Sequence, residues 1–370
     1  MYPNEEQKKF LNAQFGAVRF CFNKAIEIWN HWYKVKGKSL SFLGDIQALL
    51  PIAKKSRKYS WLKEYDSTSL QVAVQNAGKA AKDFLKGTKG FPRFKSRRDR
   101  QSSFHCTSIR LEDGKIRIPK IGLIKIVQHR PVEGELKSIT LSRDCCGDYY
   151  ASMLFKIERD DPEPLKEVEE RKVIGIDLGL KDYAVCSNGE RIPNPRPLER
   201  ALKKLRKACK DHSRKKKGSK NKEKSRIRLA KIHRRVTRIR NAFLHNLSRR
   251  IVDENQVIVL EKLDIKAMQQ NKYLARPISD AAWYEFDRQV KYKAKRVGKI
   301  PFVLDKDSPT TQTCSVCGQL NENKLGLWKR SWVCPHCLSR LDRDLNAAVN
   351  IKRQGILKLR AEMSAVLLHQ

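Results

Sequence analysis

The sequence predicts a multidomain α+β chain: an N-terminal helical region, a small β-barrel, and an α/β domain that contains an inserted four-cysteine ribbon. Apolar residues recur with a period near 3.6 over residues 4–36 and 67–86, which is typical of amphipathic helices. Residues 103–157 form short β-rich runs separated by Gly, Pro and Asp, which indicates a small β-barrel or sandwich. From residue 172 onward, apolar strands alternate with helical segments, including one expected over residues 279–297, which indicates a mixed sheet. The expected domains are residues 1–90 (helical recognition region), 91–160 (β-barrel), 171–310 (first part of the α/β domain, with basic helices at 198–252), 311–340 (ribbon) and 341–370 (second part and tail).

The charge of the chain predicts a polyanionic partner. Its 370 residues include 79 Lys and Arg against 40 Asp and Glu, a net charge of +39. Nucleic acid is the first candidate and an anionic membrane surface the second. A hydrophobic content of 40% excludes a disordered chain, and no apolar run reaches the ~18 residues of a membrane span. The polar start MYPNEEQKKF is not a secretory signal, so we expect a cytoplasmic protein.

The N-terminal region is expected to contain two long helices. Asn4 is the predicted N-cap of the first, and Gly37 is its predicted stop. Asp66 or Ser67 caps the second, which ends near Gly87. Between the two, residues 39–61 are expected to form a shorter helix and a basic loop.

The predicted barrel follows a loop that interleaves aromatic and basic residues. Its expected strands are SFHCTSIRL, GKIRIP, IGLIKIV, LKSITLSR and YYASMLFKI, and an acidic linker follows at residues 158–170. Phe91 and Phe94 in the preceding loop could stack on unpaired bases while its cations bind phosphates. The candidate cations are Arg93, Lys95, Arg97 and Arg98. The alternative is an interdomain linker whose two Phe side chains pack locally.

The densest positive charge lies in the α/β domain. Residues 200–250 hold 22 Lys and Arg against two acids, while apolar residues from Ile232 to Ile251 keep a helical period. One face can therefore pack while the others present cations to a nucleic-acid backbone. The candidate phosphate contacts are Lys215, Lys216, Lys217, Arg234, Arg235 and Arg238. The alternative is a solvated charged helix that binds no nucleic acid. His245, in the same segment, is expected to be a core residue rather than a catalytic one.

Four of the ten cysteines form a C-x₂-C-x₁₆-C-x₂-C array: Cys314, Cys317, Cys334 and Cys337. Two CxxC turns that each present two thiolates suit one structural Zn²⁺ and leave no open coordination position. Disulfide pairing and unrelated thiols are the alternatives. His336, inside the second CxxC, is expected to be an exposed spacer.

Carboxylates follow two apolar strands and begin the last helix. Asp177 ends VIGID, Glu261 ends VIVLE, and Asp342 and Asp344 precede LNAAVNI. Such groups can converge at one edge of a sheet and bind Mg²⁺ for phosphodiester cleavage. Taken singly, an acid after a strand is more often a turn residue or a helix cap.

Together these blocks resemble a known family. GIDLG, then VLE, then the CxxC pairs and DRDLNAAVNI are similar to the RuvC-type nuclease of the TnpB family, transposon-encoded RNA-guided DNA endonucleases related to type V CRISPR effectors. The resemblance covers nearly the whole chain. It implies an RNase H-like (RuvC) catalytic domain, with helical and β-barrel parts preceding it.

The resemblance assigns catalytic, magnesium-binding roles to Asp177, Glu261 and Asp344, with Asp344 preferred to Asp342 because it heads the D-x-N-A-A element. It implies structural zinc, catalytic magnesium, a guide RNA from the transposon end, and target DNA cut beside a short motif. We expect one chain to act with its RNA. The alternatives are a nuclease-inactive RNA-guided repressor, a compact type V CRISPR effector, and a plain RNA-binding zinc-ribbon protein.

Overall fold

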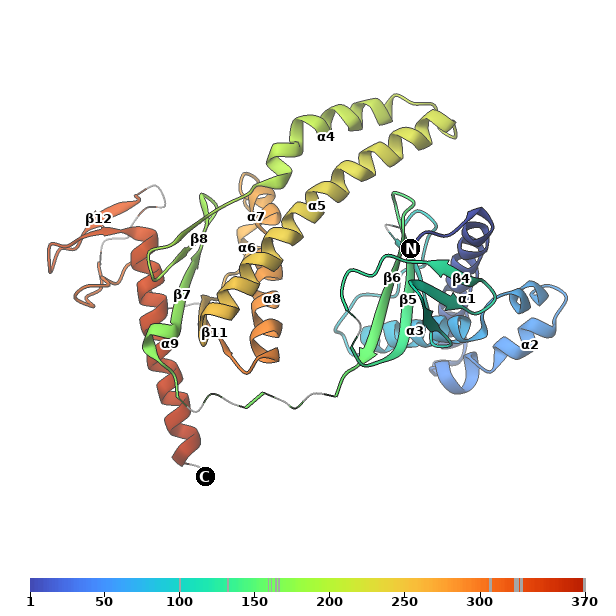
Figure 1. The fold of residues 1–370 in the computed structure, drawn as a ribbon, viewed down its shortest axis with the longest axis horizontal. Coiled ribbons are helices and arrows are strands. Elements are labelled where there is room, and N and C mark those ends of the chain that lie inside the picture. The colour runs from blue at the N-terminus through green and yellow to red at the C-terminus, as the bar shows by residue number, and fades with distance from the viewer. Residues whose placement is uncertain are drawn as a thin grey trace. The chain divides into compact units, whose positions relative to one another are not determined.

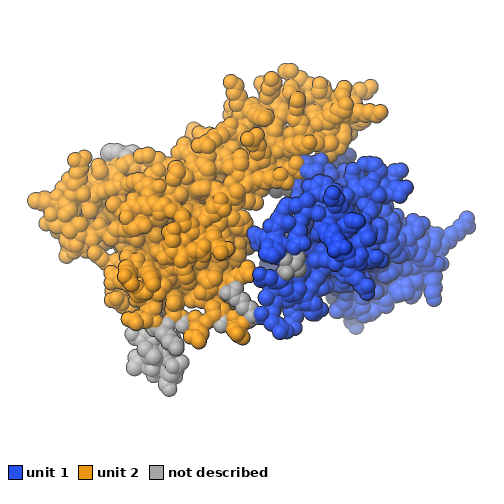
Figure 2. All heavy atoms as spheres, viewed as in Figure 1, with its two compact units in different colours: residues 1–159 blue, residues 160–370 orange. Residues whose placement is uncertain are grey.

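The structure is a computed structural model, and it forms two compact units, residues 1–159 and 160–370 (Figures 1 and 2). It describes residues 1–370 except 100, 132, 159, 161, 164, 166, 306–307, 323–325, 327–328 and 369–370. Among the described residues, no helix combines the length and apolarity that crossing a membrane requires.

Two helices organise the first unit. Helix α1 (Glu5–Lys36) starts with a capping box between Asn4 and Gln7 and ends at Gly37, whose φ of 64° is left-handed. Helix α3 (Ser67–Leu85) is capped by Asp66 and packs on α1. Both predicted helices are therefore confirmed, and their buried faces form one core. Between them lie three short elements: η1 (Phe42–Ile46), α2 (Leu49–Lys55) and η2 (Ser60–Glu64).

The strands of the first unit form two separate antiparallel sheets. One has the order β1-β5-β6 and the other β2-β3-β4. The bounds are β1 (Gln101–Cys106), β2 (Arg110–Glu112), β3 (Lys115–Ile118), β4 (Gly122–Lys125), β5 (Glu135–Asp144) and β6 (Tyr149–Lys156). The predicted closed barrel is wrong for the described residues. The run SFHCTSIRL, expected as one strand, breaks after Cys106 and supplies a strand to each sheet, so no single ladder closes.

The second unit is built on a mixed five-stranded sheet with the order β11-β10-β7-β8-β9. Strands β7, β10 and β11 are parallel, whereas β8 pairs antiparallel with β7 and β9. The bounds are β7 (Val173–Leu178), β8 (Asp182–Cys186), β9 (Arg191–Pro193), β10 (Val257–Glu261) and β11 (Ile300–Leu304), with the short η3 (Glu170–Lys172) before β7. The predicted mixed sheet is confirmed.

Helices cover both faces of this sheet (Figure 1). Ile174 and Ile176 of β7 belong to one core with α5 (Lys220–Glu254) and α8 (Trp283–Arg296). Val173 belongs to a second core with Ile351 of α9 (Arg343–Leu368), on the opposite face. The remaining helices are α4 (Pro197–Ser213), α6 (Ile265–Met268) and α7 (Ala275–Ala281).

One helical prediction is confirmed and another needs correction. The basic segment expected at residues 198–252 is helical, and it forms a packed pair, α4 and α5, joined by a turn at residues 214–219. The helix expected over 279–297 is split between α7 and α8 by Ala282, whose φ of 54° is left-handed. Strands β12 (Ser331–Val333) and β13 (Arg340–Asp342) form the cysteine ribbon, which α9 follows directly.

Candidate active site and metal centre

Asp177 and Glu261 lie side by side at the carboxyl ends of two parallel strands. Ile176 of β7 pairs with Leu260 of β10, so the two acids follow at the same level. Because side chains alternate along a strand, Asp177 shares its face with Gly175, which lies against α9. Glu261 likewise shares its face with Val259, which contacts α9 at Gly355. Both carboxylates are therefore on the α9 side of the sheet.

Asp344 joins them from the first turn of α9. Burial, and after it the neighbouring carboxylates of Asp344 and Glu261, together raise the pKa of Asp177 to about 7. Burial also raises the pKa of Glu261, against a hydrogen bond from the Thr310 hydroxyl. The structure therefore brings the three predicted acids into one electrostatic cluster. Oxygen ligands of this kind are those that Mg²⁺ prefers.

Asp342 occupies a different place. Its carboxylate accepts a hydrogen bond from the backbone N–H of Leu345 at 2.9 Å, which is a helix-capping contact. It also pairs with Arg191 at 2.7 Å. Asp342 thus begins α9, whereas Asp344 is the acid of this helix whose charge raises the pKa of Asp177.

Two neighbours of the acids were not anticipated from the sequence. The Arg330 guanidinium lies 3.3 Å from the Asp344 carboxylate, and Thr310 Oγ1 lies 3.5 Å from Glu261 Oε1. Thr310 is buried although it is in a loop. Neither residue belongs to a spaced motif with the acids, and only the folding of the ribbon segment brings them close.

Glycine allows α9 to approach the sheet. A Cβ on Gly175 would lie 2.3 Å from the carbonyl oxygen of Ala348 and 2.4 Å from the backbone nitrogen of Lys352. A Cβ on Gly355 would lie 2.5 Å from a methyl carbon of Val259. Gly175, the first glycine of GIDLG, therefore sets the distance between the strand that carries Asp177 and the helix that carries Asp344.

The four cysteines of the array form one cluster, and all their Sγ atoms lie within 4.8 Å of one another. The Sγ atoms of Cys314 and Cys337 are 3.6 Å apart, as are those of Cys317 and Cys334. A tetrahedron with Zn–S bonds of about 2.3 Å has S···S edges of about 3.8 Å, whereas a disulfide needs about 2.05 Å. The geometry fits a four-thiolate metal site and contradicts disulfide pairing. His336 is exposed and is not in the cluster.

Two asparagines attach the ribbon segment to α9. Asn346 and Asn350 donate from their Nδ2 atoms to the carbonyl of Thr313 at 2.8 and 2.6 Å. The Asn346 carbonyl in turn accepts the backbone N–H of Ser315 at 2.7 Å. Both side chains are buried. The NAAVN run thus packs against the sheet through its alanines and holds the first CxxC turn through its asparagines.

The basic helices α4 and α5 enclose a groove of about 950 Å³. Seven cations line it: Arg200, Lys204, Lys207, Lys224, Arg228, Lys231 and Arg235. Of the six predicted phosphate contacts, Arg235 lines the groove, and Arg234 and Arg238 are on α5 beside it. The other three are exposed in the α4–α5 turn: Lys215, Lys216 and Lys217. Ile239, expected on the packed face, is instead 44% exposed and also lines the groove.

The loop of residues 91–98 shows local aromatic packing and also carries exposed cations. The Phe91 ring packs against Phe84 with centroids 5.4 Å apart, which is the local packing expected of a linker. Lys95 Nζ lies 4.0 Å from the centroid of the Phe22 ring. Arg93 lies 3.7 Å from Asp99, whereas Arg97 and Arg98 are exposed. Lys95 and the three arginines are all exposed, but the Lys95 ammonium group contacts a ring of the chain itself.

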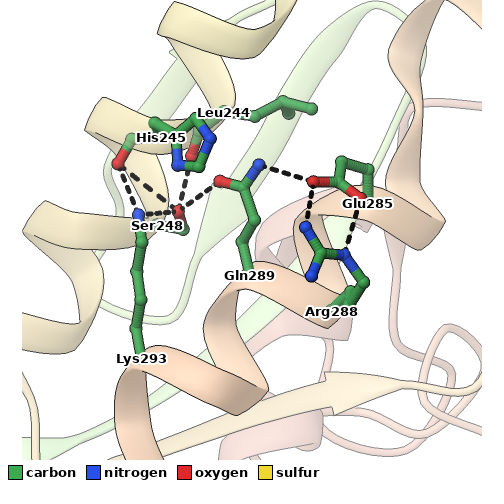
Figure 3. Close-up of polar contacts among 7 residues, drawn as sticks. All are labelled: Leu244, His245, Ser248, Glu285, Arg288, Gln289 and Lys293. Carbon is green, nitrogen blue, oxygen red and sulfur yellow. Dashed lines mark hydrogen bonds and ion pairs between the residues drawn. The ribbon is translucent and has the colours of Figure 1, made fainter. Parts of the chain in front are cut away.

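A polar network joins α5 to α8 (Figure 3). Lys293 Nζ donates to Ser248 Oγ at 2.7 Å, and Ser248 Oγ donates to Gln289 Oε1 at 3.0 Å. Gln289 Nε2 then donates to Glu285 at 2.9 Å, and Arg288 binds Glu285 as well. His245 is exposed beside this network, so its predicted core position is wrong, and its backbone carbonyl accepts from Lys293.

The chain matches known families along most of its length. Residues 154–272 match the OrfB_IS605 model, described as a probable transposase. Residues 283–351 match the Cas12f1-like TNB domain, and residues 1–38 match a helix-turn-helix domain of OrfB_IS605 proteins.

Relatives cover nearly the whole chain. A Streptomyces pristinaespiralis protein named "Putative RNA-guided DNA endonuclease" is 36% identical over 96% of this chain and 88% of its own length. Escherichia coli K12 InsQ, which has the same description, is 28% identical over 95% of this chain and 90% of its own length. The fold is similar to a chain in a Cas12f1–sgRNA–target DNA complex, with a TM-score of 0.55, 16% identity, and 94% and 83% of the two chains covered.

These matches place the chain in a transposon-associated protein class. The chain belongs to the TnpB family.

Proposed function

We propose that this protein is an RNA-guided, Mg²⁺-dependent DNA endonuclease of the RuvC type, encoded by a transposon. The observation that carries the proposal is the cluster of Asp177, Glu261 and Asp344 at one edge of the sheet. Relatives over nearly the whole chain are named as endonucleases of this kind, which supports the assignment. Guide RNA from the transposon end would select the target by base pairing, beside a short adjacent motif.

The three carboxylates would hold magnesium. When bound, such ions make water a stronger nucleophile and stabilise the leaving oxygen of a phosphodiester. The charges of Asp344 and Glu261 act on Asp177, which supports this assignment, and Thr310 donates to Glu261. Arg330 lies close enough to Asp344 to bring positive charge to a phosphate beside it.

Zinc would have a structural role. The four thiolates leave no open position for a reacting water, so the ion would shape the ribbon beside α9. The groove between α4 and α5 and the exposed arginines of residues 91–98 would bind phosphates of the guide RNA and target DNA.

The test is cleavage by the purified protein with its co-purified RNA. The RNA is sequenced, and DNA that carries the matching target is supplied with Mg²⁺ or with EDTA. We expect cutting of the matched DNA in Mg²⁺ only. Tight guided binding without any cutting would instead establish the repressor alternative.

A further inference from the structure

A cavity of about 500 Å³ lies in the second unit, separate from the acid cluster. Three segments enclose it: the β7–β8 turn, the start of α4, and residues 272–280 around α7. Leu180, Leu198 and Leu202 give it apolar walls. Its volume is in the range of pockets that enclose a small organic ligand.

The polar side of the cavity carries excess positive charge. Lys181, Lys272 and Arg276 line it and are exposed, and in the described part of the chain none of the three forms an ion pair. Tyr273 lies between them and is 91% exposed. Apolar walls, a free aromatic ring and unpaired cations together match one nucleotide, because a base stacks on the ring and a phosphate pairs with the cations.

The cavity walls are tied together. Asp280 is 7% exposed, and its carboxylate accepts from the backbone N–H of Leu198 at 2.9 Å and from Arg240 at 2.6 Å. Arg196 donates to the carbonyl of Leu180 at 3.1 Å, from a left-handed backbone with φ of 42°. These contacts join α7, α4 and the β7–β8 turn, so the cavity needs little ordering when a ligand enters.

A row of cations on α4 and at its C-cap leads to the cavity. Its members are Lys203, Arg206, Lys207 and Lys210 on the helix and Arg214 at the C-cap, and most of them are three or four residues apart. Residues at helical spacing lie on one face. Glu199 and Leu202 line both this face and the cavity, so the two surfaces are continuous.

The cavity is close to the acids along the chain. Leu180 follows Asp177 by three residues, which limits the separation of their Cα atoms to about 11 Å. Leu180 packs with the core on the face of the sheet that α5 and α8 cover, whereas the acids are on the α9 face. The cavity and the acid cluster therefore lie on opposite sides of the end of β7.

We propose that this cavity binds one unpaired nucleotide of the DNA strand that is cut. The base lies on the leucines and stacks on Tyr273, and the adjoining phosphates contact Lys272 and Arg276. The strand backbone runs along the cation row of α4 and passes the end of β7 toward Asp177. This inference rests on the proposed function and adds a strand-holding site to it.

The first experiment measures stacking without cleavage. The protein with its guide RNA is titrated with a four-nucleotide single-stranded DNA that contains 2-aminopurine, whose fluorescence is quenched by stacking. We expect Tyr273→Ala to weaken binding about tenfold and abolish the quenching. Tyr273→Phe should retain both, as should Tyr292→Ala, which removes another exposed tyrosine of the same unit.

The cations are tested by salt dependence. The double change Lys272→Gln and Arg276→Gln should lower the slope of log K against log salt by about 1.4, since each lost single-strand phosphate contact removes about 0.7. An unchanged slope would contradict the phosphate contacts. Equal or better competition by RNA of the same sequence would overturn the assignment to DNA.

Cleavage of a guided target is measured in parallel. Slower cutting by Tyr273→Ala with unchanged guided binding supports the inference. Cutting at the parent rate overturns the inference and leaves the proposed function standing. A parent protein that never cuts overturns the proposed function itself, so the two failures are distinguishable.

Discussion

Two carboxylates of the second unit show how opposite environments shift a pKa in opposite directions. Burial and the charges of Asp344 and Glu261 raise the pKa of Asp177 to about 7. Hydrogen bonds from Arg288 and Gln289 lower the pKa of Glu285 to about 2. The cation that pairs with Glu285 is Arg288 of the same chain, so this acid has a structural role. Asp177 lies among other acids, and such a site gains stability from a bound divalent cation.

The Glu285 contact predicts a pH-dependent contribution to stability. The pKa of Glu285 falls from its ordinary value of 4.5 to about 2 on folding, so its stabilisation is complete above about pH 5 and is lost as the pH falls toward 2. Because the side chain is 33% exposed, we expect Glu285→Gln to cost only about 1 kcal/mol at pH 7.

Urea unfolding of the parent and Glu285→Gln at pH 7 and pH 3 measures this difference. The gap should shrink at pH 3. Glu254→Gln, at the exposed end of α5, is the control and should change stability by less than about 0.5 kcal/mol at both values. A gap that grows at low pH would contradict the contact.

Among the elements, α9 is the one whose position decides the site, because it supplies Asp344 and holds the ribbon. Gly175→Ala would place a methyl group 2.3 Å from a backbone oxygen of α9, so the helix must move. We expect a stability loss of about 1–3 kcal/mol and strongly reduced cutting. Thermal unfolding and a cleavage assay check this.

Gly16→Ala on α1 is the matched control, since the nearest atom to its Cβ would be 3.8 Å away in a flexible arginine side chain. This change should leave cutting intact and add stability of about 0.5–1 kcal/mol. If the Gly175→Ala variant cleaves DNA at the parent rate, the close approach of α9 to the sheet does not determine the geometry of the active site.

The ribbon predicts a metal content. Four Sγ atoms at tetrahedral spacing should retain about one Zn²⁺ per chain in elemental analysis of freshly purified protein. Cys334→Ser should reduce this and loosen the ribbon, whereas Cys209→Ser, at an exposed position on α4, should not. Active protein without zinc would contradict the assignment.

The sequence predicted the elements with strong local signals and missed those that depend on tertiary packing. Asn4 and Gly37 bound α1 as expected because caps act within one turn. The interruption of the helix at Ala282 and the end of strand β1 at Cys106 have no such local signal in the sequence. The acids were found from their places at strand ends, whereas Arg330 and Thr310 reach the cluster only through the fold of the ribbon segment.

For the whole molecule, a net charge of +39 predicts that nucleic-acid binding falls steeply with salt. Neutralising Lys215, Lys216, Lys217, Arg234, Arg235 and Arg238 together to Gln should flatten the slope of log K against log salt without unfolding the chain. Filter binding across a salt series measures it. Replacing Lys215, Lys216 and Lys217 by Arg keeps the charge and should keep the slope. An unchanged slope in the neutralised variant would assign these helices another role.

Single-turnover cleavage by acid variants tests the central claim most directly. Asp177→Asn, Glu261→Gln and Asp344→Asn are compared with the parent and with Asp342→Asn, which changes a helix cap two residues from Asp344. Guided DNA binding is measured on the same samples. We predict that the first three lose at least about 1,000-fold in cutting rate and bind targets normally, while Asp342→Asn loses far less. Near-parent cutting by both Asp177→Asn and Glu261→Gln would show that this cluster is not the active site.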